Sequence, residues 1–152
     1  MILPSDDLDV LLTYAHNEHR QGDNSVIRTP DKVRYYKVSS DTQAFDNLNQ
    51  DTVSAKVDYR LDDQWSLTSL TTNTRSDYTN RLDFDQTADA NEVIRRQQDG
   101  NLFGQELRLN YNSDTVKSFL GAYYGHNSNN FHDRLLFDNV LAVTVKGDTV
   151  IE

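Results

Sequence analysis

Apolar and polar residues alternate along several segments of the chain. The longest strict case is residues 53–61, where odd positions hold Val, Ala, Val, Tyr and Leu and even positions hold Ser, Lys, Asp and Arg. Successive side chains of a β-strand point to opposite faces, so this segment has one apolar and one polar face. No helix can gather these apolar residues on a single stripe. The alternation therefore predicts a strand.

The same two-residue period recurs, more weakly in places, along the rest of the chain. Further strands are predicted at 8–14, 65–74, 102–111, 116–125 and 139–146. No segment predicts a helix of normal length. The expected fold is all-β, with about six antiparallel strands.

The predicted connections fall into two kinds that alternate along the chain. Short turns rich in Asp, Asn and Ser, which suit tight turns, are expected at 61–64 and 112–115, with two more possible at 4–7 and 146–148. Long polar loops are expected at 21–50, 79–101 and 127–138. Compact soluble domains rarely need several structureless loops longer than about 12–15 residues. Up-and-down membrane barrels combine short turns at one end with long loops at the other, so the alternation favours a partial transmembrane β-barrel.

Strand length and aromatic placement agree with that interpretation. Strands of about ten residues match the 9–11 that a tilted strand needs to cross a bilayer. Tyr59, Trp65 and Tyr111 lie within a few residues of the short turns. Tyr and Trp favour the level of the lipid headgroups, so these residues predict an aromatic girdle on the turn side. The competing interpretation places the same aromatics at the edge of a soluble β-sandwich.

Composition excludes several functional classes. The formal net charge is −9, and no basic stripe is present, so a nucleic-acid partner is not expected. The chain has no cysteine, which removes disulfides and the commonest structural zinc sites. The sequence contains no run of about 18 apolar residues, so no transmembrane helix is predicted. The mean hydropathy of −0.74 is typical of a soluble protein, but barrels with polar loops also have low averages.

Three stretches resemble a known family. Residues 63–71, Asp-Gln-Trp-Ser-Leu-Thr-Ser-Leu-Thr, resemble the turn and the "Trp, Leu-Thr-Ser-Ile-Thr" strand of TonB-dependent outer-membrane receptors. Residues 103–109, Phe-Gly-Gln-Glu-Leu-Arg-Leu, resemble their "Ser-Gln-Glu-Leu-Arg-Leu" strand. Residues 119–124, Phe-Leu-Gly-Ala-Tyr-Tyr, are similar to their "Gly-Leu-Tyr-Tyr" strand. The order and spacing match the family over roughly residues 51–127.

The resemblance implies a location, partners and a task. Residues 1–152 would be part of a receptor barrel in the outer membrane of a Gram-negative bacterium, in contact with lipid, the remainder of the barrel and a plug domain. The whole protein would take up a scarce nutrient, most often an iron–siderophore complex, with energy delivered by TonB through the plug. Plug, TonB box and signal peptide are not found before Leu8, and such barrels have 22 strands. The expectation is therefore a fragment that does not transport alone.

The candidate ligand-binding residues lie in the predicted loops. Arg95 and Arg96, in the loop 79–101, are candidates to meet an anionic ligand. His126 and His132, with Asp133 beside them, flank a loop segment and offer imidazoles to a metal or haem. For all four, a solvated loop residue without a ligand is the competing interpretation. His16 and His19 are three residues apart, so on a strand they point to opposite faces and cannot share a metal.

Other polar residues predict neither catalysis nor a bound cofactor. Asp83, Asp85 and Asp89 resemble an acidic extracellular segment of the family, but they lack the spacing of an EF-hand and are expected in a solvated loop without metal. Glu106 and Arg108 share a strand face and predict an ion pair facing the lumen. Ser and Asp are plentiful without catalytic spacing, so no enzyme is expected.

Two alternatives to the transporter stay open. A soluble β-sandwich or small lipocalin-like barrel would be a binding module; it explains the strands but not the alternation of turn and loop lengths. A barrel enzyme of the outer membrane, such as a lipase or protease, would need a His/Ser constellation on adjacent strands, which the sequence does not show.

Overall fold

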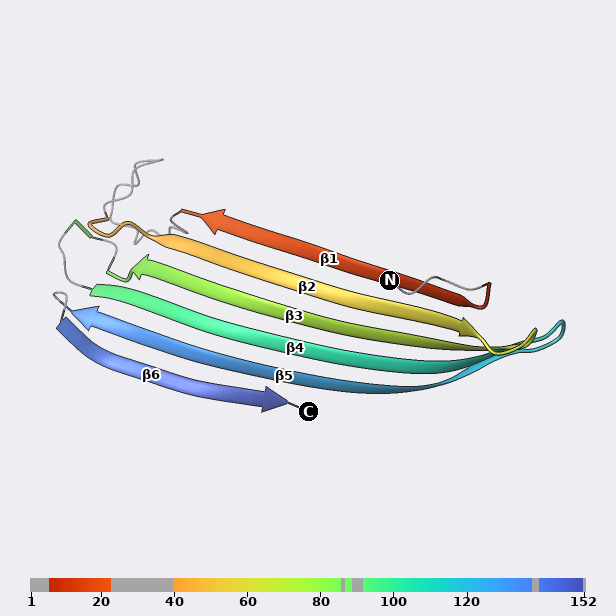
Figure 1. Cartoon of the computed structure of the whole chain (residues 1–152). Coiled ribbons are helices and arrows are strands. Elements are labelled where there is room, and N and C mark those ends of the chain that lie inside the picture. Colours follow the sequence, from red (N-terminus) through yellow and green to blue (C-terminus); the bar gives the residue numbers. More distant parts are fainter. Residues whose placement is uncertain (1–5, 23–39, 86, 89–91, 138–139, 152) are drawn as a thin grey trace.

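The computed structural model describes residues 6–22, 40–85, 87–88, 92–137 and 140–151. These residues form six antiparallel strands, which lie side by side in chain order (Figure 1). The strands are β1 (Leu8–Gln21), β2 (Phe45–Arg60), β3 (Trp65–Asp83), β4 (Glu92–Asn112), β5 (Lys117–Phe137) and β6 (Val140–Ile151). The prediction of an all-β fold with six antiparallel strands is confirmed.

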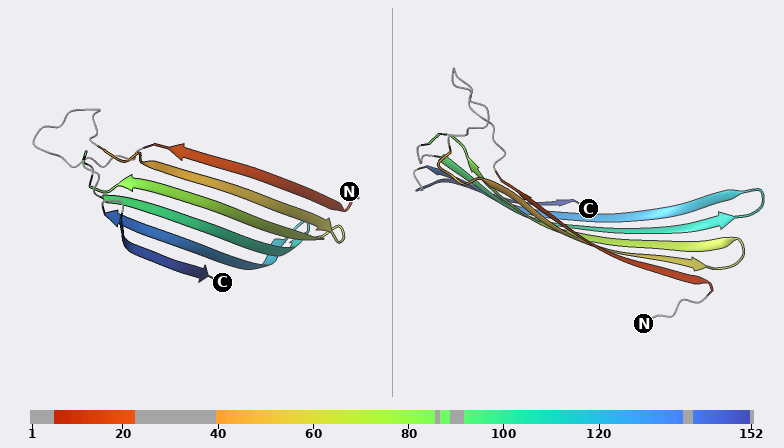
Figure 2. Two further views of the ribbon diagram at one scale, coloured as in Figure 1. Left: turned by 60° about the vertical axis from the view of Figure 1, so that its left-hand side comes forward. Right: turned by 90° about the horizontal axis from the view of Figure 1, so that it is seen from above.

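The sheet is a single twisted layer with two open edges. Every strand pairs with its neighbour in sequence, and β1 and β6 each have one partner within the described part of the chain. Figure 2 shows one curved layer, with no second layer of described residues packed on either face. The sheet is not closed into a barrel. The described residues thus show neither the second sheet of a sandwich nor the closed ring of a lipocalin.

Almost nothing is buried in this sheet. Among the described residues, the apolar residues that count as buried are Ala44 and Val93. The sheet is therefore held by its backbone ladder and by side chains that touch across neighbouring strands. The described part of the chain contains no helix that is long and apolar enough to cross a membrane.

The two short turns occur where the sequence predicts them. In the first, the Asp62 carboxylate accepts hydrogen bonds from the backbone N–H groups of Gln64 and Trp65, both at 2.8 Å. In the second, the Ser113 hydroxyl oxygen accepts from the backbone N–H of Val116 at 3.1 Å. These are the side-chain-to-backbone bonds for which Asp and Ser are favoured in turns. Of the possible first turn at 4–7, Asp6 and Asp7 lie within the described residues and form a turn.

The predicted long loops are largely wrong. β3 runs on to Asp83 and β4 starts at Glu92, so most of the predicted loop 79–101 is strand. β5 continues to Phe137, which turns nearly all of the predicted loop 127–138 into strand. β2 starts at Phe45, inside the predicted loop 21–50, of which residues 23–39 lie outside the described part. Polar residues predominate on both faces of these stretches, so they carry no regular hydrophobic alternation although the hydrogen-bonded ladder is continuous.

Strand lengths and the last turn also need correction. The strands hold 12 to 21 residues, against the predicted ten or so. The predicted turn at 146–148 is absent, because Lys146, Gly147 and Asp148 pair in register with β5. The longest strands, β4 and β5, are about twice as long as a bilayer crossing needs.

Candidate functional site

The strand register assigns every side chain to one of two faces. Residues directly opposite each other in neighbouring strands share a face. Val57 of β2 lies opposite Val10 of β1 and Ser69 of β3, and Ser69 lies opposite Leu107 of β4. We call the face that carries Val57 the belt face and the other the opposite face.

The belt face is apolar next to the short turns. We call this zone the apolar belt. Its apolar residues are Leu8, Val10, Leu12, Tyr14, Val53, Ala55, Val57, Tyr59, Trp65, Leu67, Phe103, Leu107, Leu109, Tyr111, Leu120, Ala122 and Tyr124. Large side chains stand open here: Leu120 is 76% exposed and Leu12 72%. Contact between water and apolar side chains is unfavourable, so large contiguous apolar patches are rare on soluble monomers.

Two rows of aromatic side chains frame the belt. On the turn side, the rings of Trp65 and Tyr111 lie 4.8 Å apart between centroids, and Tyr59 shares their face. On the far side, the Phe103 and Tyr124 rings lie 6.3 Å apart. Tyr14 is in the same far row, because it lies opposite Val53, which register places in line with Phe103. The sequence indicated the turn-side row; the far row emerges from register alone.

Three polar side chains that interrupt the belt satisfy one another. The Thr71 hydroxyl donates to the side-chain oxygen of Gln105 at 2.5 Å, and the Gln105 amide donates to the Ser69 hydroxyl oxygen at 3.0 Å. A polar group removed from water costs far less when it is hydrogen-bonded. The interruption by Gln105 is therefore compatible with an apolar environment.

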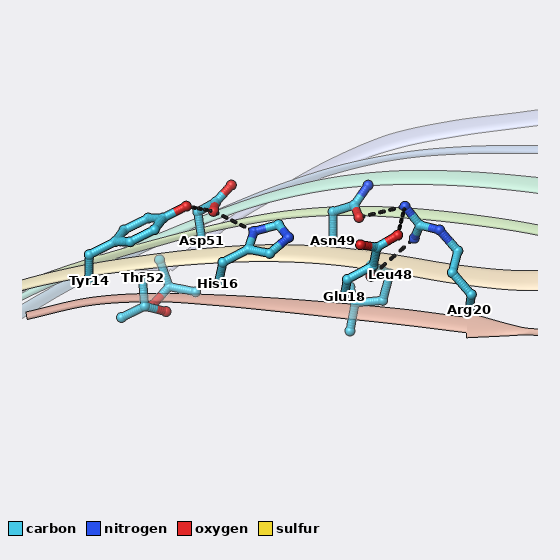
Figure 3. A network of polar contacts seen from close by, with 9 residues as sticks. Tyr14, His16, Glu18, Arg20, Leu48, Asn49, Asp51 and Thr52 are labelled. Atoms are coloured by element: carbon cyan, nitrogen blue, oxygen red, sulfur yellow. Dashed lines mark hydrogen bonds and ion pairs between the residues drawn. The ribbon is translucent and has the colours of Figure 1, made fainter.

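Beyond the far aromatic row the belt face becomes polar. We call the strand segments up to and including that row the turn-side half of the sheet, and the rest the loop-side half. At the boundary, Asp51 accepts hydrogen bonds from the Tyr14 hydroxyl at 2.7 Å and from His16 at 2.8 Å (Figure 3). These bonds, the one from Tyr14 foremost, lower the pKa of the Asp51 carboxyl. Further along, Arg20 bridges Glu18 at 2.9 Å and Asn49 at 2.8 Å.

The opposite face is largely polar on β1 to β4, whereas on β6 it carries the exposed residues Val143, Val145 and Ile151. Lys56 pairs with Asp58 at 2.7 Å, and the expected pair of Glu106 and Arg108 is present on β4. Some apolar side chains also stand on this face, among them Leu11, Phe119 and Tyr123. The Arg108 guanidinium lies 5.7 Å from the centroid of the Phe119 ring, so part of that ring is covered by a cation.

The four candidate ligand residues lie on strands, not in or beside loops. Arg95 and Arg96 belong to β4, and His126 and His132 to β5. Arg96 is on the opposite face, where its guanidinium binds the Asp133 carboxylate through two nitrogens at 2.8–3.0 Å. Being hydrogen-bonded to that carboxylate raises the pKa of Arg96.

The two histidines are far apart on one strand. His126 lies opposite Phe103, at the far rim of the belt. His132 is six residues further along β5, about 20 Å away at the rise of an extended chain. They cannot bind one metal together. His16 and His19 lie on β1 on opposite faces, as predicted.

Arg95 belongs to a row of arginines that sequence reasoning missed. In the register, Arg81 of β3 lies opposite Arg95 of β4, which lies opposite Arg134 of β5. The three share the belt face and line a groove of about 460 Å³ together with Phe45 and His132. The signal was hidden because the segments were assigned to loops, which have no register.

His132 stands next to this row and is held neutral. The Arg134 Nε donates to His132 Nε2 at 3.1 Å, which requires an unprotonated acceptor nitrogen. Partial burial, with Arg134 and Lys146 as further causes, lowers the pKa of the His132 imidazole. The Lys146 ammonium comes from β6, directly opposite His132.

A pair of like charges lies between the belt and the arginine row. Asp77 of β3 is directly opposite Asp99 of β4. A hydrogen bond with Asp77 raises the pKa of the Asp99 carboxyl, since one proton shared between the two groups removes their repulsion.

The acidic segment is not a solvated loop. Asp83 and Asp85 are each 7% exposed, and their carboxylates meet that of Asp41, with ligand oxygens within 4.8 Å of one another. The backbone N–H of Thr87 donates to Asp85 at 3.0 Å. Oxygen atoms at this spacing suit a hard cation chemically. Asp89, the third predicted member, lies outside the described residues.

Comparison with protein-family models, with curated proteins and with solved structures gives no match to this chain.

Proposed function

We propose that this chain forms part of the wall of a larger outer-membrane β-barrel, of the TonB-dependent receptor type. The observation that carries the proposal is the apolar belt, framed on both sides by aromatic residues on one face of a single up-and-down sheet. Lipid on the belt face and water on the opposite face explain why one surface is apolar and the other polar.

The height of the belt supports this proposal. From Tyr111 to Phe103, the two aromatic rows on β4 are eight residues apart, about 27 Å along an extended strand. At the strand tilt of about 35–45° found in such barrels, this length corresponds to about 19–22 Å of height. Outer-membrane barrels have an apolar band about 25 Å tall with aromatic girdles at both interfaces. The remaining ten residues or so of β4 would then extend beyond the membrane on the loop side.

The open edges support a larger barrel. In lipid, every backbone N–H and C=O group must be paired, so an open sheet edge at membrane depth is strongly unfavourable. β1 has one partner among the described strands, and β6 covers β5 from Asn127 onward, leaving Lys117–His126 as an edge. Further strands from the same barrel would pair with both edges.

The task follows from the resemblance to TonB-dependent receptors. The whole protein would take up a scarce nutrient, with an iron–siderophore complex as the foremost ligand, and would be driven by TonB through a plug domain. The polar opposite face of this chain would line the lumen around that plug. This sheet by itself would supply wall and surface, not transport.

The most direct test is to sequence the native locus on both sides of this reading frame and to measure uptake. We expect an in-frame plug-like domain upstream, further alternating strands downstream, and uptake of ferric siderophores that is lost on deletion of the locus. Stop codons near both ends, together with a stable water-soluble monomer of this length, would contradict the proposal and favour the small β binding module.

A further inference from the structure

We propose that Arg81, Arg95 and Arg134 form a binding site for a phosphate-bearing ligand on the loop-side half of the belt face. The three arginines come from three adjacent strands and stand directly opposite one another in the register. Neighbouring strands are about 4.8 Å apart, so the row brings three positive charges within about 10 Å. Like charges placed directly opposite each other destabilise a sheet. A bound anion would remove this repulsion.

The arginines of the row differ from most others in the described part of the chain. Arg20, Arg60, Arg96 and Arg108 each form an ion pair with a carboxylate. No ion pair joins the three arginines of the row to a described carboxylate. The repulsion among the three guanidinium groups is therefore not neutralised by a described carboxylate.

Arg81 is the least exposed of the three. Its Nε is buried and has no hydrogen-bond partner among the described residues. A buried donor without a partner is costly, more so on a charged group. Arg134 uses its Nε on His132, which leaves its two terminal nitrogens for a ligand. The row therefore offers donors that the protein itself does not use.

The donor set favours phosphate over a carboxylate. Each guanidinium has five N–H donors in a planar fork that matches phosphate oxygens. A carboxylate brings one charge and two oxygens, too few for three guanidinium groups. A phosphate group brings three oxygens and up to two negative charges at neutral pH. Thr79 and Gln97 of the adjacent row line the same groove and add neutral hydrogen-bonding groups.

Nearby acidic groups do not fill the site. Asp133 is on the opposite face and is bound by Arg96. Asp77 and Asp99 share the belt face but lie four residues from the arginine row, about 13 Å along the strands. Asp83 is two residues beyond Arg81, and its carboxylate is grouped with those of Asp41 and Asp85.

The phosphate could come from two sources. The site is on the same face as the apolar belt, so a phosphorylated lipid headgroup of the surrounding membrane can reach it if the proposed function holds. A free phosphate compound can reach it in either case. The site itself rests on the arginine row and does not depend on membrane insertion.

The test is binding of inorganic pyrophosphate to the full chain in uncharged detergent micelles, followed by calorimetry. Vesicles of phosphatidylcholine with and without lipid A, which carries two phosphates, form the second arm. The variants are Arg81→Gln, Arg95→Gln, Arg134→Gln and the triple substitution. Arg75→Gln is the matched control, because Arg75 is on the same face of β3 as Arg81. Fluorescence of Trp65, the single tryptophan, reports folding far from the site.

We expect each single substitution to weaken pyrophosphate binding about tenfold, as loss of a charge-assisted hydrogen bond would. The triple variant should not bind, and Arg75→Gln should change affinity less than about twofold. If binding is confined to lipid A vesicles but still needs the row, the source is the lipid headgroup. Absence of binding in both arms, or equal loss in Arg75→Gln, would overturn the site. Pyrophosphate binding by a chain that does not associate with vesicles would keep the site and contradict the proposed function.

Discussion

The turn-side and loop-side halves of this sheet share the same strands and the same register, yet the belt face is apolar in the first and mostly polar in the second. On β4, the belt face of the turn-side half carries Phe103, Leu107 and Leu109, whereas the loop-side half carries Arg95 and Asp99 on that face. On β4 the opposite face is largely polar in both halves. Backbone pairing continues across the boundary without a break, so pairing does not require hydrophobic alternation.

This difference shows that alternation reports the surroundings of a strand and not the strand itself. A face in contact with lipid must be apolar, whereas a strand with water on both sides can be polar on both faces. Under the proposed function, the change from lipid to water lies at the far aromatic row.

The largest effect is expected from a charge placed in the belt. In the barrel completed by its remaining strands, Leu107→Arg should reduce the free energy of insertion into phosphatidylcholine vesicles by about 2–4 kcal/mol, the cost of an arginine on the lipid face near mid-membrane. The matched change Ser128→Arg, on the same face of the loop-side half, should alter it by less than about 0.5 kcal/mol. Vesicle flotation measures both. Equal losses would mean that the two halves meet the same solvent.

A smaller effect is expected at the turn-side aromatic row. The Trp65 and Tyr111 rings are in contact, and such pairs contribute about 0.5–1.5 kcal/mol beyond their buried area. A double-mutant cycle with Trp65→Ala and Tyr111→Ala, again by flotation, should show coupling of that size. Strictly additive effects would show that the pair does not act as a unit at the membrane surface.

In the loop-side half, the ion pair of Arg96 and Asp133 should contribute less. Both side chains are partly exposed, at 49% and 28%, and pairs of this kind contribute about 0.2–1 kcal/mol. Arg96→Gln should speed amide hydrogen exchange in the loop-side ends of β4 and β5 by a matching factor. Combining it with Asp133→Asn should add little, because the first change has already broken the pair. Faster exchange in the turn-side half would contradict a local role.

The smallest effect is expected at the pair of Asp77 and Asp99, where a substitution should raise stability and not lower it. The pKa of Asp99 is raised above its ordinary value of 3.8 by its hydrogen bond with Asp77. Stability from the shared proton is therefore present at low pH and lost as the pH rises through the raised pKa. Asp99→Asn should slow exchange in the loop-side half at pH 7, by a factor that corresponds to a few tenths of a kcal/mol. The gain should vanish near pH 4; a variant less stable than the original at pH 7 would refute this assignment.

Sequence alone predicted the turn-side half well, because that is where the physical signal is strong. The strand at residues 53–61 shows strict alternation, and the Asp62 turn has the side chain that its backbone bonds require. Tyr59, Trp65 and Tyr111 could be assigned to one end because the turns set their distance from it. The far row of Tyr14, Phe103 and Tyr124 needs the register of five strands, which no single segment contains.

Sequence failed in the loop-side half for the same physical reason. Residues 79–101 are mostly polar at both parities, and their few apolar residues do not alternate, so the segment does not distinguish a strand from a loop. In the sequence, Arg96 is a ligand candidate because its ion-pair partner cannot be recognised there. Asp133 is 37 positions away and is brought near Arg96 by strand pairing alone. Arg81 and Arg134 were missed as companions of Arg95 because charge clusters across strands depend on register.

The central claim is that lipid touches the belt face of the turn-side half and no other surface of this sheet. Because the chain contains no cysteine, single cysteines carrying a fluorescent probe can be introduced along β4 and quenched by brominated lipids. The account predicts strong quenching at odd-numbered positions from Phe103 to Tyr111, weak quenching at the even-numbered positions between them, and none at either parity from residue 93 to residue 101. Quenching without alternation, or continuing through residues 93–101, would contradict it.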